Sequence, residues 1–363
     1  MEEYWMGICS IPGVYQAQID QLIRHFGNPK AAWEAKETEF KIWKEKEVKW
    51  IDDFLTFRKH HSIAGVCHRA REKGINFISR DNESFPEKLK NLTDCPAGLF
   101  YKGRLPNPEQ YSVAIIGARQ CSHYGKVMAQ ELSSAMTEAG AQVISGMAYG
   151  IDGYAQMASV SRGGDSFGIL GCGVDICYPV ENYSLYSMLQ ESGGLISEFP
   201  VGSQPQRIHF PMRNRIISGL SDVVVVVEAR KKSGSLITAD LALDQGKDVY
   251  AVPGRNGDVL SYGCNHLIEQ GAGLVLSVES LLEHLNLLKK TEKNREETQK
   301  KKQLALAREE NLLYSNLNLR PKSLQELSEK TDFSLPVLIN ALYELERKGL
   351  AAEISKNYYA KLK

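Results

Sequence analysis

The sequence lacks the features that identify membrane, secreted and zinc-ribbon proteins. Its longest aliphatic run covers only residues 223–227, whereas a membrane-spanning helix needs about 18–20 apolar residues. The N-terminus has no basic segment followed by an apolar one, as a secretory signal has. The seven cysteines are odd in number and include no CxxC pair, which argues against a disulfide framework or a zinc ribbon. We therefore expect a cytoplasmic protein with reduced thiols and no membrane partner.

The sequence also lacks the short motifs of common enzymes. It contains no H-E-x-x-H, no G-x-S-x-G and no cluster of metal ligands. None of its glycine-rich stretches has the G-x-G-x-x-G spacing, and the spacing from Gly117 to Gly125 is too long for a P-loop. We expect no catalytic residue, no metal and no cofactor, and hence a protein that is not an enzyme.

A net charge is absent as well, because 44 basic residues balance 44 acidic ones. This balance excludes a diffusely basic nucleic-acid binder. The middle of the chain, residues 105–285, is acidic, with 11 Lys and Arg against 18 Asp and Glu. A focused basic patch is still compatible with this composition, because the local potential of a cleft can oppose the net charge.

Alternating strands and helices are predicted for residues 105–285. The β-branched run 223–227 is typical of a central strand that is buried on both faces. Strands that alternate with helices predict an α/β fold with a doubly wound, mostly parallel, Rossmann-like sheet. We expect four further segments around it, namely a helical domain at 1–62, a connector packed on the core at 63–104, a basic linker at 286–303 and a final module at 304–363.

The two terminal modules carry patterns of their own. The turn Ile11–Val14 precedes an amphipathic helix and is either the phosphate-binding turn of a helix-hairpin-helix or a packing turn in a small helical domain. At the other end, Ser323 and Glu326 predict a capping box, and the order of elements is that of a winged helix. Its second helix carries Glu344 and Glu346, which favours protein contact over base reading.

Three glycine-rich loops follow predicted strands, where open α/β sheets place their ligand crevice. Their backbone N–H groups suit phosphates, although each could also be a strand-to-helix turn without a ligand. Three such loops at successive strand ends favour a binding site. The candidate residues are Gly117, Ala118 and Arg119 in the first loop, Ser145 and Gly146 in the second, and Gly171 and Gly173 in the third.

The segment 207–215 is the most specific signal for a nucleic acid. Arginine forks match phosphate oxygens, and a phenylalanine offers a stacking face worth about 1–3 kcal/mol per base. For Arg213 and Arg215 the alternative is an internal ion pair, for example with Glu198, Glu228 or Asp152. The candidates here are Arg207, Phe210, Arg213, Asn214 and Arg215.

Hydroxyl side chains follow the predicted central strand at Ser233 and Ser235. They could cap the helix that begins there, which would be a sufficient explanation of their presence. They could also donate to a phosphate or accept from an arginine. Both serines are therefore candidate site residues.

These motifs, taken in order, resemble the DNA processing protein A family. The resemblance covers about residues 80–275 and rests on 117–119, 145–152, 171–175, 178–179, 210–221, 233–238, 252–254 and 263–268. It implies an extended Rossmann fold that binds single-stranded DNA with little sequence preference. It also implies a homodimer through about 245–285 and delivery of the strand to a RecA-type recombinase during natural transformation. The terminal modules resemble the family's sterile-alpha-motif-like and winged-helix domains.

The family's DNA contacts carry over by resemblance to Gly117, Arg119, Arg207, Phe210, Arg213 and Arg215. Two positions depart from the family pattern. Ala118 replaces the usual serine and removes a hydroxyl that could bind phosphate. Val180 stands where some members have a lysine, so that contact is expected to be missing.

Two other functions fit parts of the sequence. The same crevice could serve an enzyme that acts on nucleoside monophosphates, but 233–238 lacks the Pro-Gly-Gly-x-Gly-Thr spacing and Ala239-Asp240 does not supply the glutamate of such enzymes. A pure interaction scaffold would use the winged helix and the dimer surface as its working parts.

Overall fold

The computed structural model describes residues 1–44, 48–288, 308–318 and 321–362. The chain divides into two compact units, Met1–Thr291 and Glu292–Lys363. Most of the linker predicted at 286–303 lies outside the described residues. Within the described residues, no helix combines the length and apolar character needed to cross a membrane.

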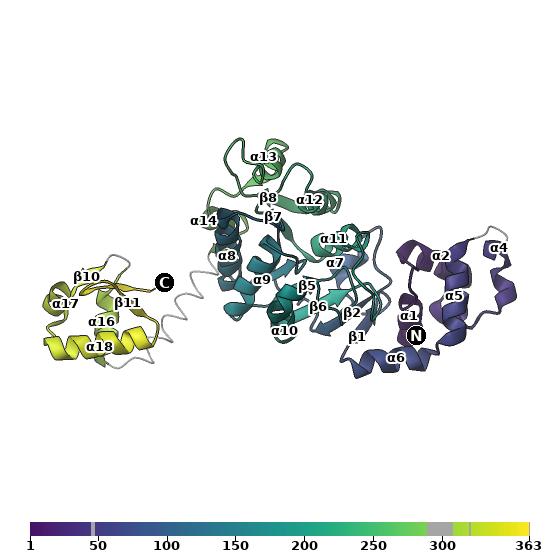
Figure 1. Ribbon diagram of the computed structural model, residues 1–363, viewed down its shortest axis with the longest axis horizontal. Coiled ribbons are helices and arrows are strands. Elements are labelled where there is room, and N and C mark those ends of the chain that lie inside the picture. The colour runs from purple at the N-terminus through teal and green to yellow at the C-terminus, as the bar shows by residue number, and fades with distance from the viewer. Residues whose placement is uncertain (45–47, 289–307, 319–320, 363) are drawn as a thin grey trace. The chain divides into compact units, whose positions relative to one another are not determined.

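A nine-stranded sheet forms the centre of the first unit (Figure 1). Its order is β1-β2-β6-β5-β4-β3-β7-β8-β9, with β1 and β2 antiparallel to each other, β2 antiparallel to β6 and all other pairs parallel. The α/β, mostly parallel Rossmann-like fold is therefore confirmed. The strands are β1 (Asn76–Ser79), β2 (Gly98–Gly103), β3 (Ser112–Ile116), β4 (Gln142–Ser145), β5 (Ser166–Ile169), β6 (Gly193–Ser197), β7 (Val223–Val226), β8 (Asp248–Ala251) and β9 (Gly273–Leu274).

The central strand β7 shows why the sheet is covered on both faces. All its residues are buried, and alternate valines enter different apolar clusters. Val224 and Val226 pack on the side of α11 and α12, whereas Val223 and Val225 pack on the side of α8 and α9. Successive side chains of a strand point to opposite faces, so an uninterrupted run of valines needs an apolar layer on each face. The helices of this sheet are α7 (Glu87–Lys90), α8 (His123–Glu138), α9 (Ile151–Ser161), η2 (Val180–Asn182), α10 (Tyr183–Glu191), α11 (His209–Leu220), α12 (Gly234–Asp244), α13 (Tyr262–Glu269) and α14 (Val278–His284).

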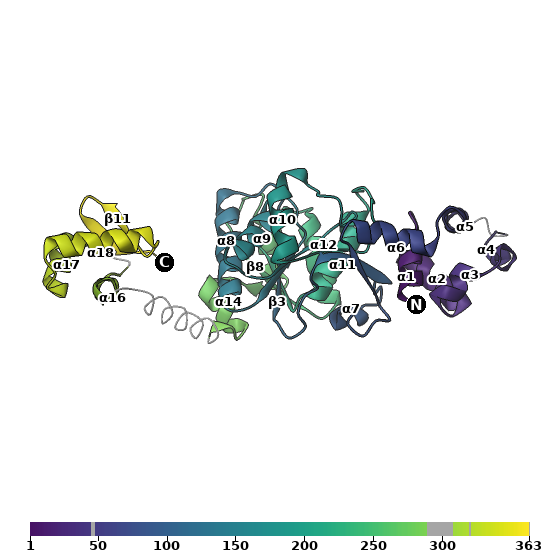
Figure 2. The same ribbon diagram turned by 90° about the horizontal axis from the view of Figure 1, so that it is seen from below.

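Helices from the N-terminal segment pack at the β1 end of the sheet (Figures 1 and 2). Trp5, Leu22 and Phe54 are buried in a cluster of their own that extends to Phe100 in β2. The segment predicted as a connector, 63–104, does more than pack on the core, because it supplies β1 and β2. The helices are α1 (Glu2–Cys9), α2 (Gln16–Phe26), α3 (Pro29–Glu34), η1 (Glu37–Phe40), α4 (Lys41–Lys44), α5 (Lys49–His60) and α6 (Ile63–Glu72), and we call residues 2–72 the N-terminal helices.

The second unit has its own small core, built around Leu313, Leu327 and Leu342. Ser323 and Glu326 form the predicted capping box at the start of α17. The order of elements matches the predicted winged helix, and that assignment stays a prediction. The elements are α16 (Arg308–Asn316), β10 (Lys322–Ser323), α17 (Leu324–Thr331), α18 (Leu335–Arg347), β11 (Ala351–Ser355) and β12 (Tyr358–Lys361), with sheet order β10-β12-β11.

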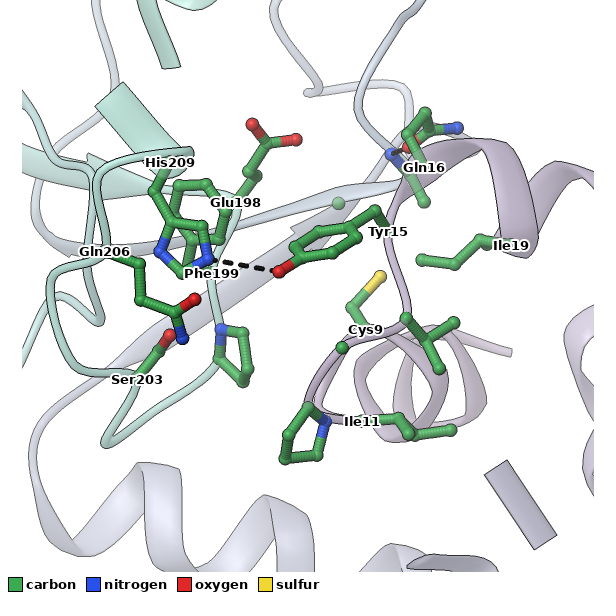
Figure 3. Close-up of a pocket in the computed structure, with 16 residues that line it drawn as sticks. Cys9, Ile11, Tyr15, Gln16, Ile19, Glu198, Phe199, Ser203, Gln206 and His209 are labelled. Carbon is green, nitrogen blue, oxygen red and sulfur yellow. Dashed lines mark hydrogen bonds between the residues drawn. The ribbon is translucent and has the colours of Figure 1, made fainter. Parts of the chain in front are cut away.

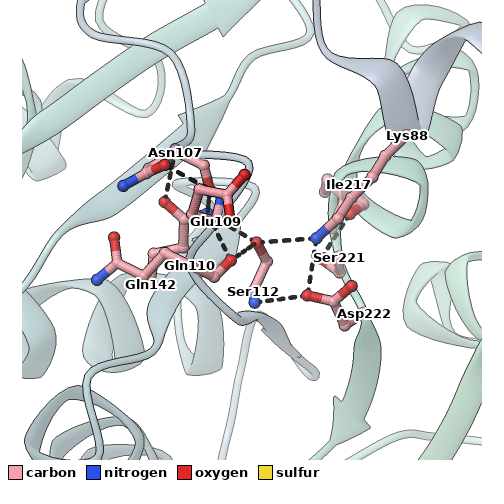
Figure 4. Close-up of polar contacts among 9 residues, drawn as sticks. All are labelled: Lys88, Asn107, Glu109, Gln110, Ser112, Gln142, Ile217, Ser221 and Asp222. Carbon is pink, nitrogen blue, oxygen red and sulfur yellow. Dashed lines mark hydrogen bonds and ion pairs between the residues drawn. The ribbon is translucent and has the colours of Figure 1, made fainter.

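A polar network ties together the amino ends of β3, β4 and β7 (Figure 4). Asp222, directly before β7, accepts from the Ser112 N–H at 2.8 Å and lies 2.7 Å from the Lys88 ammonium. The Gln142 amide donates to Ser112 Oγ at 2.8 Å and to the Asn107 carbonyl at 2.9 Å. Gln142 is fully buried, so its amide depends on these partners for its hydrogen bonds, and an apolar replacement removes all of them at once.

Replacing Gln142 should therefore destabilise the fold. Gln142→Leu leaves the backbone groups of residue 107 without this partner, and we expect the free energy of unfolding to fall by about 1–3 kcal/mol. Urea denaturation measures the loss. Gln21→Leu, at an exposed position on α2, is the matched control and should change stability little. Equal stability of the two variants would contradict the role given to this network.

Candidate nucleic-acid interface

A wide groove lies over the carboxyl ends of β3, β4 and β7. Strand order reverses at β3, which pairs with β4 on one side and with β7 on the other. The loops after β3 and its neighbours therefore lead to helices on opposite faces of the sheet. The crevice between such loops is where open α/β sheets bind ligands. Of the predicted site residues, the groove is lined by Gly117, Ala118, Arg119, Arg207, Phe210, Arg213, Asn214, Ser233 and Ser235.

Glycine allows the first two loops to approach each other at the groove floor. Gly150 has a φ of 73°, and a Cβ there would lie 2.3 Å from the Ala118 carbonyl oxygen. No other residue type fits both the left-handed backbone and this contact. The two loops therefore form one continuous edge of the groove.

Several predicted residues lie behind the groove and do not line it. Ser145 is buried and donates to the Ile115 carbonyl at 2.7 Å, which ties β4 to β3. Gly146 and Gly171 have no room for a side chain, because Arg213 and Phe210 pack against them. The N–H of Gly173 donates to Ser203. These residues shape the floor and are not exposed to a ligand.

Arg215 is not brought to the groove, contrary to the expectation that it contacts DNA. Its side chain is 6% exposed, its Nη2 donates to Glu198 and its Nε lies 2.9 Å from Asp94. Burial raises the pKa of Glu198 and the charge of Arg215 opposes that rise. The structure thus shows the internal ion pair that was the alternative for this residue.

Arg213 occupies the groove floor but faces inward. It is 4% exposed, and its Nη1 donates to the carbonyls of Gly146 and Ile169 at the ends of β4 and β5. Burial lowers the pKa of Arg213 to about 10, and the charge of Asp152 opposes that shift. Asp152 is itself held by the Gly146 N–H at 2.9 Å. Arg213 therefore supports the floor from below, with its charge balanced by a carboxylate.

The exposed Arg119 and Tyr178 both lie beside the half-buried Phe210 ring. The Arg119 guanidinium carbon lies 5.1 Å from the centre of the Phe210 ring, a cation–π distance. The Tyr178 ring lies 5.6 Å from the same ring at 37°. Among the described residues, neither Arg119 nor Arg207 forms an ion pair, and both are exposed. Both guanidinium groups are therefore accessible from the groove.

Sequence reasoning missed part of the groove. Arg230 and Lys232 line it directly after β7, and Tyr149 and Tyr178 line it with rings about 40% exposed. The basic residues 230–232 follow the predicted central strand in the sequence. Because the carboxyl ends of parallel strands border the crevice, this position could have identified them as groove residues. Among the described residues, no group of three or more His, Cys, Asp or Glu side chains could hold a metal ion.

Comparison with known proteins gives matches over most of the chain. The family model described as DNA recombination-mediator protein A matches residues 76–286. Protein Smf of Escherichia coli is 33% identical over 98% of this chain and 95% of its own length. DNA processing protein DprA of Streptococcus pneumoniae is 41% identical over 55% of this chain and 71% of its own length.

Solved structures agree with these matches. The X-ray structure of DNA processing protein A from Streptococcus pneumoniae has a TM-score of 0.64 and 31% identity, and the match covers 78% of this chain and 98% of that one. The structure of the Helicobacter pylori protein, described for its single-stranded DNA binding mode, has a TM-score of 0.53 and 28% identity, and the match covers 58% of this chain and 95% of that one.

Arg215 should matter for stability. Arg215→Met leaves the buried Glu198 carboxylate without its partner, and breaking such a pair costs about 3–5 kcal/mol. We expect a loss of that size in the free energy of unfolding, measured by urea denaturation. Arg162→Met removes an exposed arginine paired with Glu138 and should cost at most about 1 kcal/mol. A similar small loss for both variants would show that the buried pair is not structural.

Proposed function

The chain belongs to the DNA recombination-mediator protein A family, and from this premise we propose that it binds and protects single-stranded DNA in the groove at β3, β4 and β7. We further propose that it loads a RecA-type recombinase onto the bound strand, in recombination and in natural transformation. Its action is binding and delivery and needs no catalysis. The single observation that carries this proposal is that Arg119 and Arg207, beside an aromatic cluster in an otherwise acidic domain, are exposed and form no ion pair within the described part of the chain.

Phosphates supply most of the affinity in this proposal. Arg119, Arg207, Arg230 and Lys232 line one groove, although residues 105–285 contain only 11 basic residues. A cleft focuses such charges, so the local potential attracts a polyanion despite the net negative charge around it. Each phosphate neutralised releases counterions, and binding then weakens as salt rises.

Bases contribute through stacking at the aromatic cluster. Phe210, Tyr178 and Tyr149 line the groove, and the last two are exposed. Every base has a face that can stack on an aromatic ring or on a guanidinium plane, whatever its hydrogen-bonding edge. Contacts to phosphates carry no sequence information either. The groove is therefore suited to single strands of any sequence, whose bases are free to turn toward the rings.

A homodimer through about residues 245–285 is part of the proposal. Strand β9 is an edge strand in the described sheet, since it pairs only with β8. Within residues 245–285, four large apolar side chains are 40–77% exposed, namely Val259, Tyr262, Leu274 and Leu276. An edge strand with apolar neighbours is the kind of surface that another chain covers.

Removing the free arginines tests the DNA site. Arg119→Ala and Arg207→Ala should each weaken binding of labelled oligo-dT and of a mixed-sequence strand about three- to tenfold. Each should also make the slope of log affinity against log salt less negative by about 0.7, the value per phosphate for single strands. Fluorescence anisotropy at several salt concentrations measures both quantities.

Arg162→Ala, at an exposed arginine outside the groove, is the control for these variants and should leave affinity and slope unchanged. Competition with a nucleoside monophosphate should not displace the strand. Unchanged affinity after combined replacement of Arg119 and Arg207 would reject the groove as the DNA site.

Charge placed at the proposed dimer surface should separate the protomers. Leu276 is 77% exposed, and Leu276→Glu would bury a carboxylate without a partner if this surface is covered. Light scattering should show a dimer for the unchanged chain and a monomer for the variant. Tyr183→Glu, on the exposed side of α10, is the control and should stay dimeric. A monomeric unchanged chain, or a dimeric Leu276→Glu variant, would contradict the proposed interface.

A further inference from the structure

A cavity lies at the seam between the N-terminal helices and the sheet (Figure 3). Tyr15, from the turn before α2, and His209, the first residue of α11, face each other across it. His209 stands between Arg207 and Phe210, two residues that line the DNA groove. The same short segment thus borders both the seam and the groove.

The contacts of His209 settle where its proton lies. The ring is 2% exposed and stacks on Phe199 at 3.9 Å. Its Nδ1 lies 3.2 Å from the Gly171 carbonyl oxygen, which can only accept, so Nδ1 carries a hydrogen. Burial lowers the pKa of His209, so the ring is neutral and Nε2 is an acceptor. The Tyr15 hydroxyl, 3.3 Å from Nε2, is then the donor.

Gly171 connects this hydrogen bond to the groove. A Cβ at Gly171 would lie 2.9 Å from Phe210 Cδ1, so the phenylalanine ring rests on the glycine backbone. His209 holds the carbonyl of the residue that supports Phe210. Tyr15, by donating to Nε2, in turn favours the tautomer of neutral His209 whose Nδ1 donates to that carbonyl.

Other contacts hold the N-terminal helices in place without Tyr15. Arg80 pairs with Asp20 at 2.6 Å, and the Trp5 indole donates to Asp81 at 2.8 Å. The apolar cluster of these helices also reaches into the sheet. Loss of the Tyr15 hydroxyl alone therefore removes the link to His209 and leaves the helices packed.

We propose that Tyr15 and His209 are positioning residues through which the N-terminal helices set the Phe210 ring in the DNA groove. This inference rests on the proposed function. The N-terminal helices then contribute to DNA affinity without touching the strand. Their contribution passes through Gly171 and Phe210 and concerns base stacking.

A double-mutant cycle tests this chain of contacts. Tyr15→Phe should weaken binding of labelled oligo-dT about three- to tenfold, the effect of losing one supporting hydrogen bond. The slope of log affinity against log salt should not change, because no phosphate contact is lost. In the Phe210→Ala background, Tyr15→Phe should have almost no further effect, since the ring that it positions is gone.

Tyr4→Phe is the matched control, because the Tyr4 hydroxyl donates to Glu34 at an exposed site in the same helices. It should leave affinity unchanged, and the thermal midpoints of both tyrosine variants should stay close to that of the unchanged chain.

Two results would overturn the inference. One is full affinity of the Tyr15→Phe variant while Phe210→Ala weakens binding. The other is an equal loss on Tyr15→Phe with and without Phe210, which would place the effect elsewhere. Failure of Phe210→Ala and of the Arg119 variant to weaken binding would instead contradict the proposed function, and this inference with it.

Discussion

The pairing of β3 with both β4 and β7 is the constraint on which the rest of the structure depends. Because the chain leaves β3 first toward β4 and later returns to β7 on its other side, the loops after these strands separate and open a crevice. The valines of β7 hold this arrangement, since they are buried on both faces. The groove is thus a consequence of strand order, and its side chains are supplied by loops that meet only in the folded sheet.

The polar side chains at the two ends of the parallel strands differ in whether they are paired within the protein. At the amino ends, buried polar side chains such as Gln142 and Ser112 satisfy one another and the backbone. At the carboxyl ends, Arg119 and Arg207 are exposed and form no ion pair among the described residues. A fully paired network stabilises a fold, whereas binding needs groups whose partner is the ligand. The sheet keeps these opposing requirements at opposite edges.

Helix α11 also carries both kinds of side chain, those paired within the protein and those that border the groove. Arg213 and Arg215 turn inward, to strand carbonyls and to carboxylates, while Phe210 and Arg207 near its start border the groove. A buried guanidinium must be paired and hydrogen-bonded, so the inward arginines are bound to the protein. His209 lies among them and links the helix start to Tyr15 of the N-terminal helices.

The sequence by itself determined the class of fold and the loops that line the groove. Both followed from local features: the valine run at 223–227, the glycine-rich loops after strands and the ordered motifs of one family. Such local patterns can be recognised without knowledge of the tertiary contacts. Only the tertiary structure decided which arginines are free, because the partners of Arg215 lie at Asp94 and Glu198, far from it along the chain. It also decided that β1 and β2 extend the sheet, since strand pairing joins distant segments whose contact no local pattern records.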